Sequence, residues 1–232
     1  MKGFRRGCLI IALSSLITSN LIAGVNVKII KDNQTIIHNA PARYDIEGNF
    51  VGDNIQHVTQ LDSSYYENVN CGPACISMIG TYYDKKIDIV DLNNFITPSY
   101  KGYSTISLEK MMQKYGIKYS CGFLEDNDTK KVDDEVLVNY IDGNRIALLA
   151  IDTQYVRTKA DLPESRTISS KIGRSYTGAS NHFILCTGYI RIDGKLYYQV
   201  LDPLEYGYTY IPANDLAKAI EANWPYCYLF EK

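Results

Sequence analysis

The spacing of apolar residues changes near Gly143, and this change constrains the fold more than any other feature of the chain. Between Cys71 and Gly143, apolar residues recur at steps of three and four, which is the period of a helix packed along one side. After Gly143, short apolar runs alternate with turn residues, which is typical of strands. Helices first and strands afterwards predict an α+β domain.

The clearest helix is predicted over residues 71–84. It begins at Cys71, and Pro73 lies in its first turn, where a missing backbone N–H costs nothing. Its apolar positions have helical spacing and indicate a buried helix: Ala74, Cys75, Met78, Ile79 and Tyr82. Further helices are predicted at residues 87–95, at 107–115 before Gly116, and at 133–141 before Gly143.

The second half of the chain predicts a sheet. Strands are expected at residues 145–151, 182–190, 196–201 and 208–211. The pair Asp193-Gly194 lies between the second and third of these, and such a pair favours a tight hairpin turn. We therefore expect residues 182–190 and 196–201 to be adjacent antiparallel strands.

The first 24 residues differ from the rest in composition. Three basic residues precede an apolar run from Cys8 to Ile17, and this run of about ten residues is too short to span a bilayer, which needs roughly 20. This pattern is typical of a secretion signal cleaved near Ala23 or Gly24, so a secreted or periplasmic protein is expected. An uncleaved anchor or a buried first helix are the alternatives. Residues 25–57 then predict a β-rich lead-in, and residues 58–232 a single domain.

Composition excludes several classes of protein. With 46% hydrophobic and 22% charged residues, the chain can form a packed core. Its 24 basic and 26 acidic residues provide no cationic field, so we expect no nucleic-acid partner. Cys71 and Cys75 have the spacing C-x3-C but no second close pair of ligands follows, so neither a metal nor another cofactor is predicted. No stable membrane insertion is expected once the signal is removed.

Three residues suggest a catalytic site. Cys71 lies at a helix start, where unsatisfied N–H groups and the helix dipole favour a thiolate. His182 opens one arm of the predicted hairpin, and Asp202 ends the other, about 11 and about 8 residues from the turn. Asp202 could orient the imidazole of His182 while its other ring nitrogen serves the thiol of Cys71. Each residue alone has a structural explanation, as a buried thiol, a core histidine or a turn aspartate. Their combination and order favour a triad.

Three segments carry a resemblance to a known family. Residues 70–83 (NCGPACISMIGTYY), 181–189 (NHFILCTGY) and 201–203 (LDP) resemble the peptidase C39-like family of papain-fold cysteine peptidases. Residues 102–116 and 141–150 are similar to that family's second helix and to the strand before its histidine. The resemblance runs from about Val58 to the C-terminus.

This resemblance implies a papain-like fold in which the nucleophile helix packs on a C-terminal antiparallel sheet. It implies Cys71 as nucleophile, His182 as base and Asp202 as its orienting partner. A glutamine before the cysteine would donate to the oxyanion; Gln60 fits best, with Gln56 as the alternative. Gln60 is 11 residues from Cys71, more than is usual in the family, because residues 63–68 are inserted. Residues 152–181 form a second insertion relative to the family. Its role could be that of a lid, a substrate-selecting loop, an activation site or a solvated loop.

The predicted function is that of a secreted cysteine peptidase acting on a protein or peptide through a thioester at Cys71. The resemblance does not carry over leader cleavage, because family members with that activity are fused to a transporter. The same triad order also serves acyltransferases, transglutaminases and deamidases. A papain-like binding module without activity is a further alternative.

The cysteine count fits a free nucleophile. Loss of Cys8 with the signal leaves five cysteines, an odd number that favours one free thiol, for which Cys71 is the candidate. The other four could form up to two disulfides, in three possible connectivities, or remain buried thiols: Cys75, Cys121, Cys186 and Cys227.

Overall fold

The structure is a computed structural model that describes most of the chain. It describes residues 25–31, 34–40, 46–52, 54–61, 65–156, 171–172, 180–204 and 208–232. The predicted secretion signal, residues 1–24, lies outside the described residues, as does most of the insertion at 152–181. Among the described helices, none combines the length and the apolar character needed to cross a bilayer.

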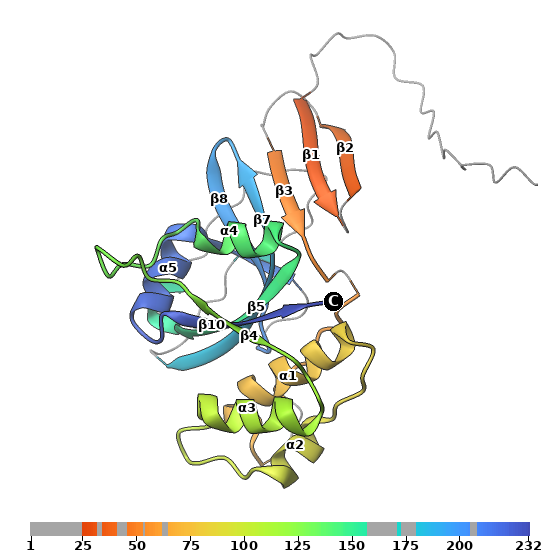
Figure 1. The fold of residues 1–232 in the computed structure, drawn as a ribbon, viewed down its shortest axis with the longest axis vertical. Helices are drawn as coiled ribbons and strands as arrows, with labels where there is room; N and C mark the ends of the chain where they lie inside the picture. The colour runs from red at the N-terminus through yellow and green to blue at the C-terminus, as the bar shows by residue number, and fades with distance from the viewer. Residues whose placement is uncertain are drawn as a thin grey trace, which may run out of the picture.

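Three helices gather at one end of the molecule (Figure 1). A short 3-10 helix η1 (Glu67–Val69) leads into α1 (Cys71–Tyr82), which packs against both α2 (Ile89–Phe95) and α3 (Thr105–Lys114). The side chains of Asp88 and Ser104 accept hydrogen bonds from backbone N–H groups at the starts of α2 and α3. The predicted helices at 71–84, 87–95 and 107–115 are thus observed with small differences at their ends.

The rest of the described chain forms a sheet around one long strand, β7 (Asn181–Ile192). One edge of β7 pairs antiparallel with β8 (Lys195–Leu201). Along its other edge, β7 pairs first with β5 (Arg145–Asp152) and then with β3 (Ile46–Phe50), both antiparallel. The strand of the nucleophile's predicted partner, His182, is therefore held on both edges.

The sheet extends outward from these central strands. β10 (Tyr226–Glu231) pairs with β5, and β4 (Ser120–Phe123) pairs with β10. On the other side, β9 (Tyr208–Pro212) pairs with β8, and the short β6 (Lys171–Ile172) runs parallel to β9. β1 (Val25–Lys31) and β2 (Gln34–Ala40) continue the sheet beyond β3, and β1 runs parallel to β3.

Two more helices and one 3-10 turn cover the sheet. α4 (Val136–Asp142) packs against β5 and β7, and α5 (Ala213–Glu221) packs against β5, β8 and β9. The 3-10 helix η2 (Thr153–Val156) follows β5 and contacts α5. This architecture confirms the predicted α+β class, in which the helix that begins at Cys71 packs on a mainly antiparallel sheet.

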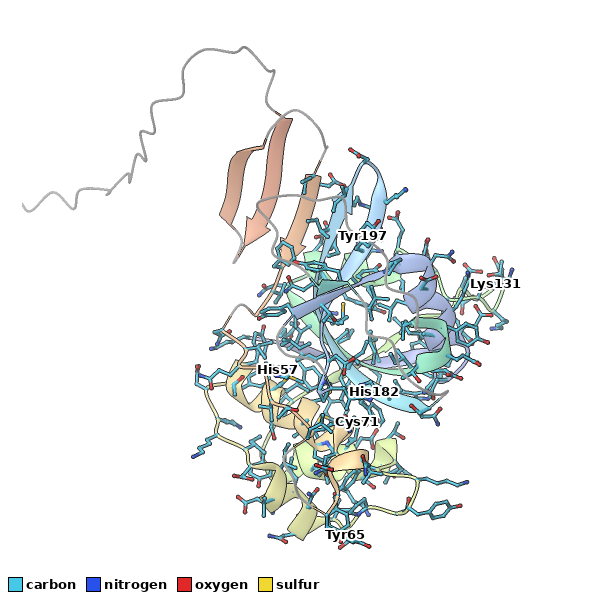
Figure 2. The ribbon with its side chains drawn as sticks, turned by 180° about the vertical axis from the view of Figure 1, so that it is seen from behind. His57, Tyr65, Cys71, Lys131, His182 and Tyr197 are labelled. Carbon is cyan, nitrogen blue, oxygen red and sulfur yellow. The ribbon has the colours of Figure 1, made fainter. Side chains whose placement is uncertain are left out.

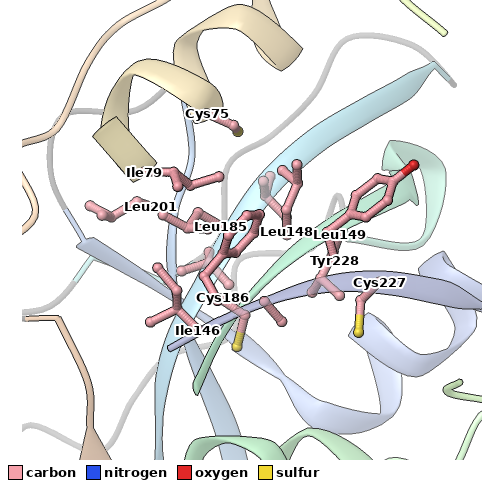
Figure 3. Packing of buried hydrophobic residues seen from close by; sticks show 14 of the residues in the cluster. Cys75, Ile79, Ile146, Leu148, Leu149, Leu185, Cys186, Leu201, Cys227 and Tyr228 are labelled. Carbon is pink, nitrogen blue, oxygen red and sulfur yellow. The ribbon is translucent and has the colours of Figure 1, made fainter. Parts of the chain in front are cut away.

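One apolar core joins α1 to the sheet (Figure 3). Cys75 and Ile79 on α1 lie over Leu185 of β7 and Leu201 of β8. Burial of a large apolar side chain stabilises a fold by about 1.5–3 kcal/mol, so this contact fixes α1 relative to β7. The position of Cys71 relative to His182 therefore follows from core packing.

The described cysteines are all free thiols. Three of them are fully buried and pack as small apolar groups in the core: Cys75, Cys186 and Cys227. Cys121 is exposed on the edge strand β4, and Cys71 is half-buried. Of the alternatives left open by the sequence, the structure has unpaired thiols and no disulfide among these five residues.

Candidate active site

Cys71 is the first residue of α1, as the sequence predicts. The N–H of Gly72 and the N–H of Phe183 both contribute hydrogen bonds to its sulfur. Gly72 itself is buried, and a Cβ atom there would lie 2.7 Å from Cδ2 of Leu108 on α3. Gly72 therefore lets α1 lie close to Leu108 of α3, which would have to move for a larger residue.

His182 and Asp202 form a buried pair. Nε2 of His182 donates to Oδ1 of Asp202 over 2.7 Å, and the two residues are 4% and 2% exposed. His182 is also hydrogen-bonded to Cys71. Because Nε2 is engaged by Asp202, Nδ1 is the ring nitrogen that remains for the thiol. The structure thus brings the three predicted residues together in the order Cys71, His182, Asp202, and Figure 2 labels the first two side by side.

This order changes the acidity of the two central groups. Burial by itself raises the pKa of the Cys71 thiol, but the hydrogen bond and positive charge of His182, together with the backbone N–H groups of Phe183 and Gly72, lower this pKa below its ordinary value. Burial by itself lowers the pKa of His182, but the carboxylate of Asp202 and the sulfur of Cys71 raise it above its ordinary value. Both shifts favour a thiolate paired with an imidazolium.

A cavity of about 320 Å³ opens onto the pair of Cys71 and His182. One wall comes from the helical end of the molecule and the other from the sheet. Its lining residues are Asn68, Val69, Cys71, the segment 101–105, Ala150, Asn181, His182, Phe183, Asn223 and Trp224. Cys71 is therefore reachable from the cavity, whereas Asp202 is buried and does not line it.

The two candidate glutamines lie at opposite ends of α1. Gln60 is buried, and its Nε2 donates to the carbonyl of Glu67, four residues before Cys71. Gln56 is exposed, and its backbone N–H donates to Oγ1 of Thr81, near the far end of α1 and about 15 Å along the helix from Cys71. The structure therefore places Gln60, but not Gln56, near the start of α1. Gln60 is not among the residues that line the cavity.

The predicted insertion at 152–181 has a fixed base. The N–H of Thr153 donates to the carbonyl of Ser180, and the N–H of Ser180 donates to Oγ1 of Thr153. Asp152 and Asn181 form the last pair between β5 and β7. The two ends of the insertion therefore meet at the strand pair next to that of His182, and Asn181 lines the cavity.

The segment before Gln60 contributes to the site in a way that the sequence does not indicate. The side chain of His57 and the backbone of Gln60 both bind the Asp202-Pro203 turn, across more than 140 positions of sequence. The cavity wall formed by Trp224 is likewise unexpected, because β10 and α5 lie outside the predicted elements. The one available signal was the presence of His57 and Gln60 in a single short extended segment.

The comparisons with known proteins agree with the geometry. The Peptidase C39 family model matches residues 63–144. No curated protein matches the chain. A solved structure of a putative C39-like peptidase from Bacillus anthracis is 13% identical, with a TM-score of 0.52, covering 79% of this chain and 98% of its own.

Two further solved structures are similar. The peptidase domain of Streptococcus ComA, a bifunctional ABC transporter, is 13% identical with a TM-score of 0.48, over 77% of this chain and 99% of its own. A double-glycine-motif protease of an AMS/PCAT transporter, in complex with its leader peptide, is 14% identical with a TM-score of 0.47, over 78% and 95%. Residues 63–144 therefore match the peptidase C39 family, and the chain has the α+β, papain-like fold of a C39-like peptidase.

Proposed function

We propose that the protein is a cysteine peptidase that cleaves peptide or isopeptide bonds through a thioester at Cys71. The observation that carries this proposal is the hydrogen-bonded order Cys71, His182, Asp202 at the wall of an open cavity. The match of residues 63–144 to the Peptidase C39 family supports the same class of enzyme. The substrate is a protein or a peptide.

In the proposed reaction, the Cys71 thiolate attacks the carbonyl carbon of the scissile bond, and the carbonyl π electrons move to oxygen. The imidazolium of His182 then gives a proton to the leaving amine as the C–N bond breaks, which leaves a thioester on Cys71. Neutral His182 next takes a proton from water, whose oxygen attacks the thioester carbonyl. The C–S bond then breaks, which releases the carboxylic acid and returns Cys71 as a thiolate beside the imidazolium of His182. Throughout, Asp202 holds Nε2 and stabilises the imidazolium.

The negatively charged oxygen formed in this attack needs hydrogen-bond donors to stabilise it. A backbone N–H at the start of α1 is suited to this because it points along the helix dipole. Of the two glutamines, Gln60 is the proposed side-chain donor, since it lies at the Cys71 end of α1 and only one of its two amide hydrogens is used by Glu67. We expect Gln60→Ala to lower kcat by about 10²-fold or more.

Export is the second part of the proposal. It rests on residues 1–24 alone, whose basic start and short apolar run are typical of a secretion signal. The test is the mass of the protein recovered outside the cytoplasm of a bacterial host. Loss of a segment ending near Ala23 or Gly24 is expected, and full-length protein retained in the cells would contradict it.

The test of the activity uses mass spectrometry of a peptide library incubated with the protein, with and without a small primary amine. Hydrolysed products are expected from the wild type, and none from Cys71→Ala. A matched control is Cys121→Ser, which removes the exposed thiol on β4 and should leave activity unchanged.

The amine arm separates the enzyme classes. Products that carry the amine in preference to water would identify an acyltransferase, and release of ammonia from glutamine would identify a deamidase. Products that persist in Cys71→Ala would overturn the assignment of the nucleophile. A wild type that yields no product and shows no rapid labelling of Cys71 by iodoacetamide would favour a binding module.

A further inference from the structure

A short segment before α1 holds the turn that carries Asp202. Nε2 of His57 donates to the backbone carbonyl of Asp202 over 2.8 Å. Oγ1 of Thr59 and the N–H of Gln60 donate to the next carbonyl, that of Pro203, over 3.2 and 2.9 Å. Three donors from four consecutive positions therefore bind two consecutive carbonyls.

The turn needs this support because Asp202 lies past the end of its strand. β8 ends at Leu201, whose partner on β7 is Leu185. Pro203 has no backbone N–H with which to continue a ladder. The carboxylate is held at Oδ1 by two donors, Nε2 of His182 and the N–H of Leu204. Since Leu204 lies in the same turn, its bond does not anchor the turn to the rest of the molecule.

Of the three donors, His57 is the one that contacts Asp202 itself. Its side chain reaches the carbonyl of the residue whose carboxylate orients His182. Thr59 and Gln60 act one residue further on. His57 is also only half-buried, so its ring is not explained as a core side chain. Figure 2 shows His57 above His182 and Cys71, near the junction of α1 and the sheet.

We propose that His57 is a positioning residue, whose Nε2–H fixes the backbone of Asp202 so that its carboxylate stays aligned with His182. This inference rests on the proposed function of Cys71, His182 and Asp202. It adds a second histidine to the site, outside the three residues that the sequence singled out. His57 does not touch the substrate or the reacting atoms in this proposal.

The proposal predicts an effect on the state of Cys71. If the carboxylate of Asp202 shifts, it stabilises the imidazolium of His182 less, and the thiolate of Cys71 forms only at higher pH. Replacement of His57 by Met keeps a side chain of similar length but removes the N–H donor. We expect the midpoint of Cys71 alkylation against pH to rise by about one pH unit in His57→Met.

The experiment measures the rate of Cys71 alkylation by iodoacetamide from acid to alkaline pH, in a Cys121→Ser background. It compares wild type, His57→Met, His57→Gln and the exposed control Asn54→Ala. Gln places an amide N–H at a reach close to that of Nε2, so His57→Gln should restore the wild-type midpoint. If His57→Met does not fold, His57→Asn replaces it, because its shorter amide does not reach the carbonyl.

The outcomes separate positioning from general packing. A raised midpoint in His57→Met, with a wild-type midpoint in both His57→Gln and Asn54→Ala, supports the proposal. An unchanged midpoint in His57→Met overturns it, even if the melting temperature falls, and so does a raised midpoint that His57→Gln does not restore. A wild-type Cys71 that reacts no faster than an ordinary thiol would instead contradict the proposed function.

Discussion

Cys71 differs from the other buried thiols in the groups that surround its sulfur. Burial raises the pKa of Cys186 and of Cys227 to about 12. Burial raises the pKa of Cys75 as well, and the negative charges of Cys71 and Asp202 raise it further. Only at Cys71 do a hydrogen bond and a positive charge from His182 outweigh burial. Cys71 and Cys75 lie one turn apart on α1, yet the pKa of the first is lowered and that of the second is raised.

The same pair predicts the dependence of activity on pH. The active form has thiolate and imidazolium together, so activity appears as pH rises through the lowered pKa of Cys71. It is lost as pH rises through the raised pKa of His182. The plateau of kcat/KM should therefore begin below the ordinary thiol value of about 8.5 and end above the ordinary imidazole value of about 6.5.

Asp202→Asn tests the cause of the alkaline limb. The amide has nearly the same shape but no charge, so the pKa of His182 should fall and the alkaline limb of kcat/KM should move to lower pH. The acid limb should move the opposite way, because a less stable imidazolium lowers the pKa of Cys71 less. A profile that does not move in Asp202→Asn would show that another group controls the alkaline limb.

How far the residues of the site can be predicted from sequence depends on their local signals. Cys71 at a helix start and His182 at a strand start each follow from the spacing of apolar residues. His57 carries no such signal, because its role depends on a contact with a turn 145 positions away. A pairing of that kind is a product of the tertiary fold.

Among the elements, the hairpin of β7 and β8 does most to bring His182 to Asp202. Its turn, Asp193-Gly194, has φ values of 49° and 75°, the left-handed conformation at both positions that a tight two-residue hairpin requires. His182 and Asp202 do not lie at equal numbers of residues from this turn along the two strands. The register shifts by one residue between Cys186 and Gly188, so that Thr187 has no partner on β8.

The bulge could not be predicted from the sequence, and it has a structural use. The carbonyl of Thr187 accepts a hydrogen bond from the N–H of Val51, just after β3. Oγ1 of Thr187 accepts a hydrogen bond from Nε2 of Gln199 on β8. The unpaired residue therefore binds the lead-in on one side and β8 on the other. The predicted strand at 182–190 contains no signal for this irregularity beyond Gly188.

Gly188 gives a prediction at this scale. A Cβ atom there would lie 2.8 Å from the backbone oxygen of Asn49 and 2.5 Å from Cδ1 of Phe50, both on β3. Gly188→Ala should therefore force β3 away from β7 and destabilise the fold by about 1–3 kcal/mol, measured by chemical denaturation. Gly143→Ala is the control, because φ is −77° and the nearest atoms would lie at 3.3 Å. Equal stability of the two variants would refute the close packing of β3 on β7.

Two elements of the cavity wall lie outside the helices and strands predicted from the sequence. β10 is an internal strand between β5 and the edge strand β4, and its central residues are buried. Such a strand has no alternation of apolar and polar residues to identify it. α5 has no side-chain cap at its start, although its buried residues Ala213, Leu216, Ala217 and Ile220 have the spacing of an amphipathic helix. Together these elements place Asn223 and Trp224 at the cavity, so that wall of the site was also unpredicted.

For the whole molecule, the active site depends on the joining of two unlike parts. The helical end supplies Cys71 and the segment 101–105, and the sheet supplies His182, Asp202 and the wall around Trp224. A single core cluster runs through both parts. The predicted division at residues 57 and 58 stays a prediction, but β3 belongs to the same sheet as β7.

The lead-in contains one strand, β3, that pairs with β7, and two strands that lie beyond β3. β3 pairs with β7 over five residues, and Ile46 and Val51 beside it are 2% and 5% exposed. Nδ2 of Asn49 also donates to Asp142 on α4 over 2.9 Å. In contrast, within the described residues β2 pairs with β1 alone, and β1 pairs with β2 and β3. Their removal should leave the sheet around β7 intact.

Two truncations test this difference by thermal unfolding. Removal of residues 1–45 should change the melting temperature by only a few degrees, because β3 remains.

Removal of residues 1–52 takes away Ile46 and Val51, whose burial contributes about 4 kcal/mol in total. At roughly 2–4 °C for each kcal/mol in a chain of this size, the melting temperature should fall by about 10 °C or more. Alkylation of Cys71 should slow as well, because Val51 binds Thr187, the residue at which the register between β7 and β8 shifts. Equal melting of the two truncated proteins would mean that β7 does not require β3 at its edge.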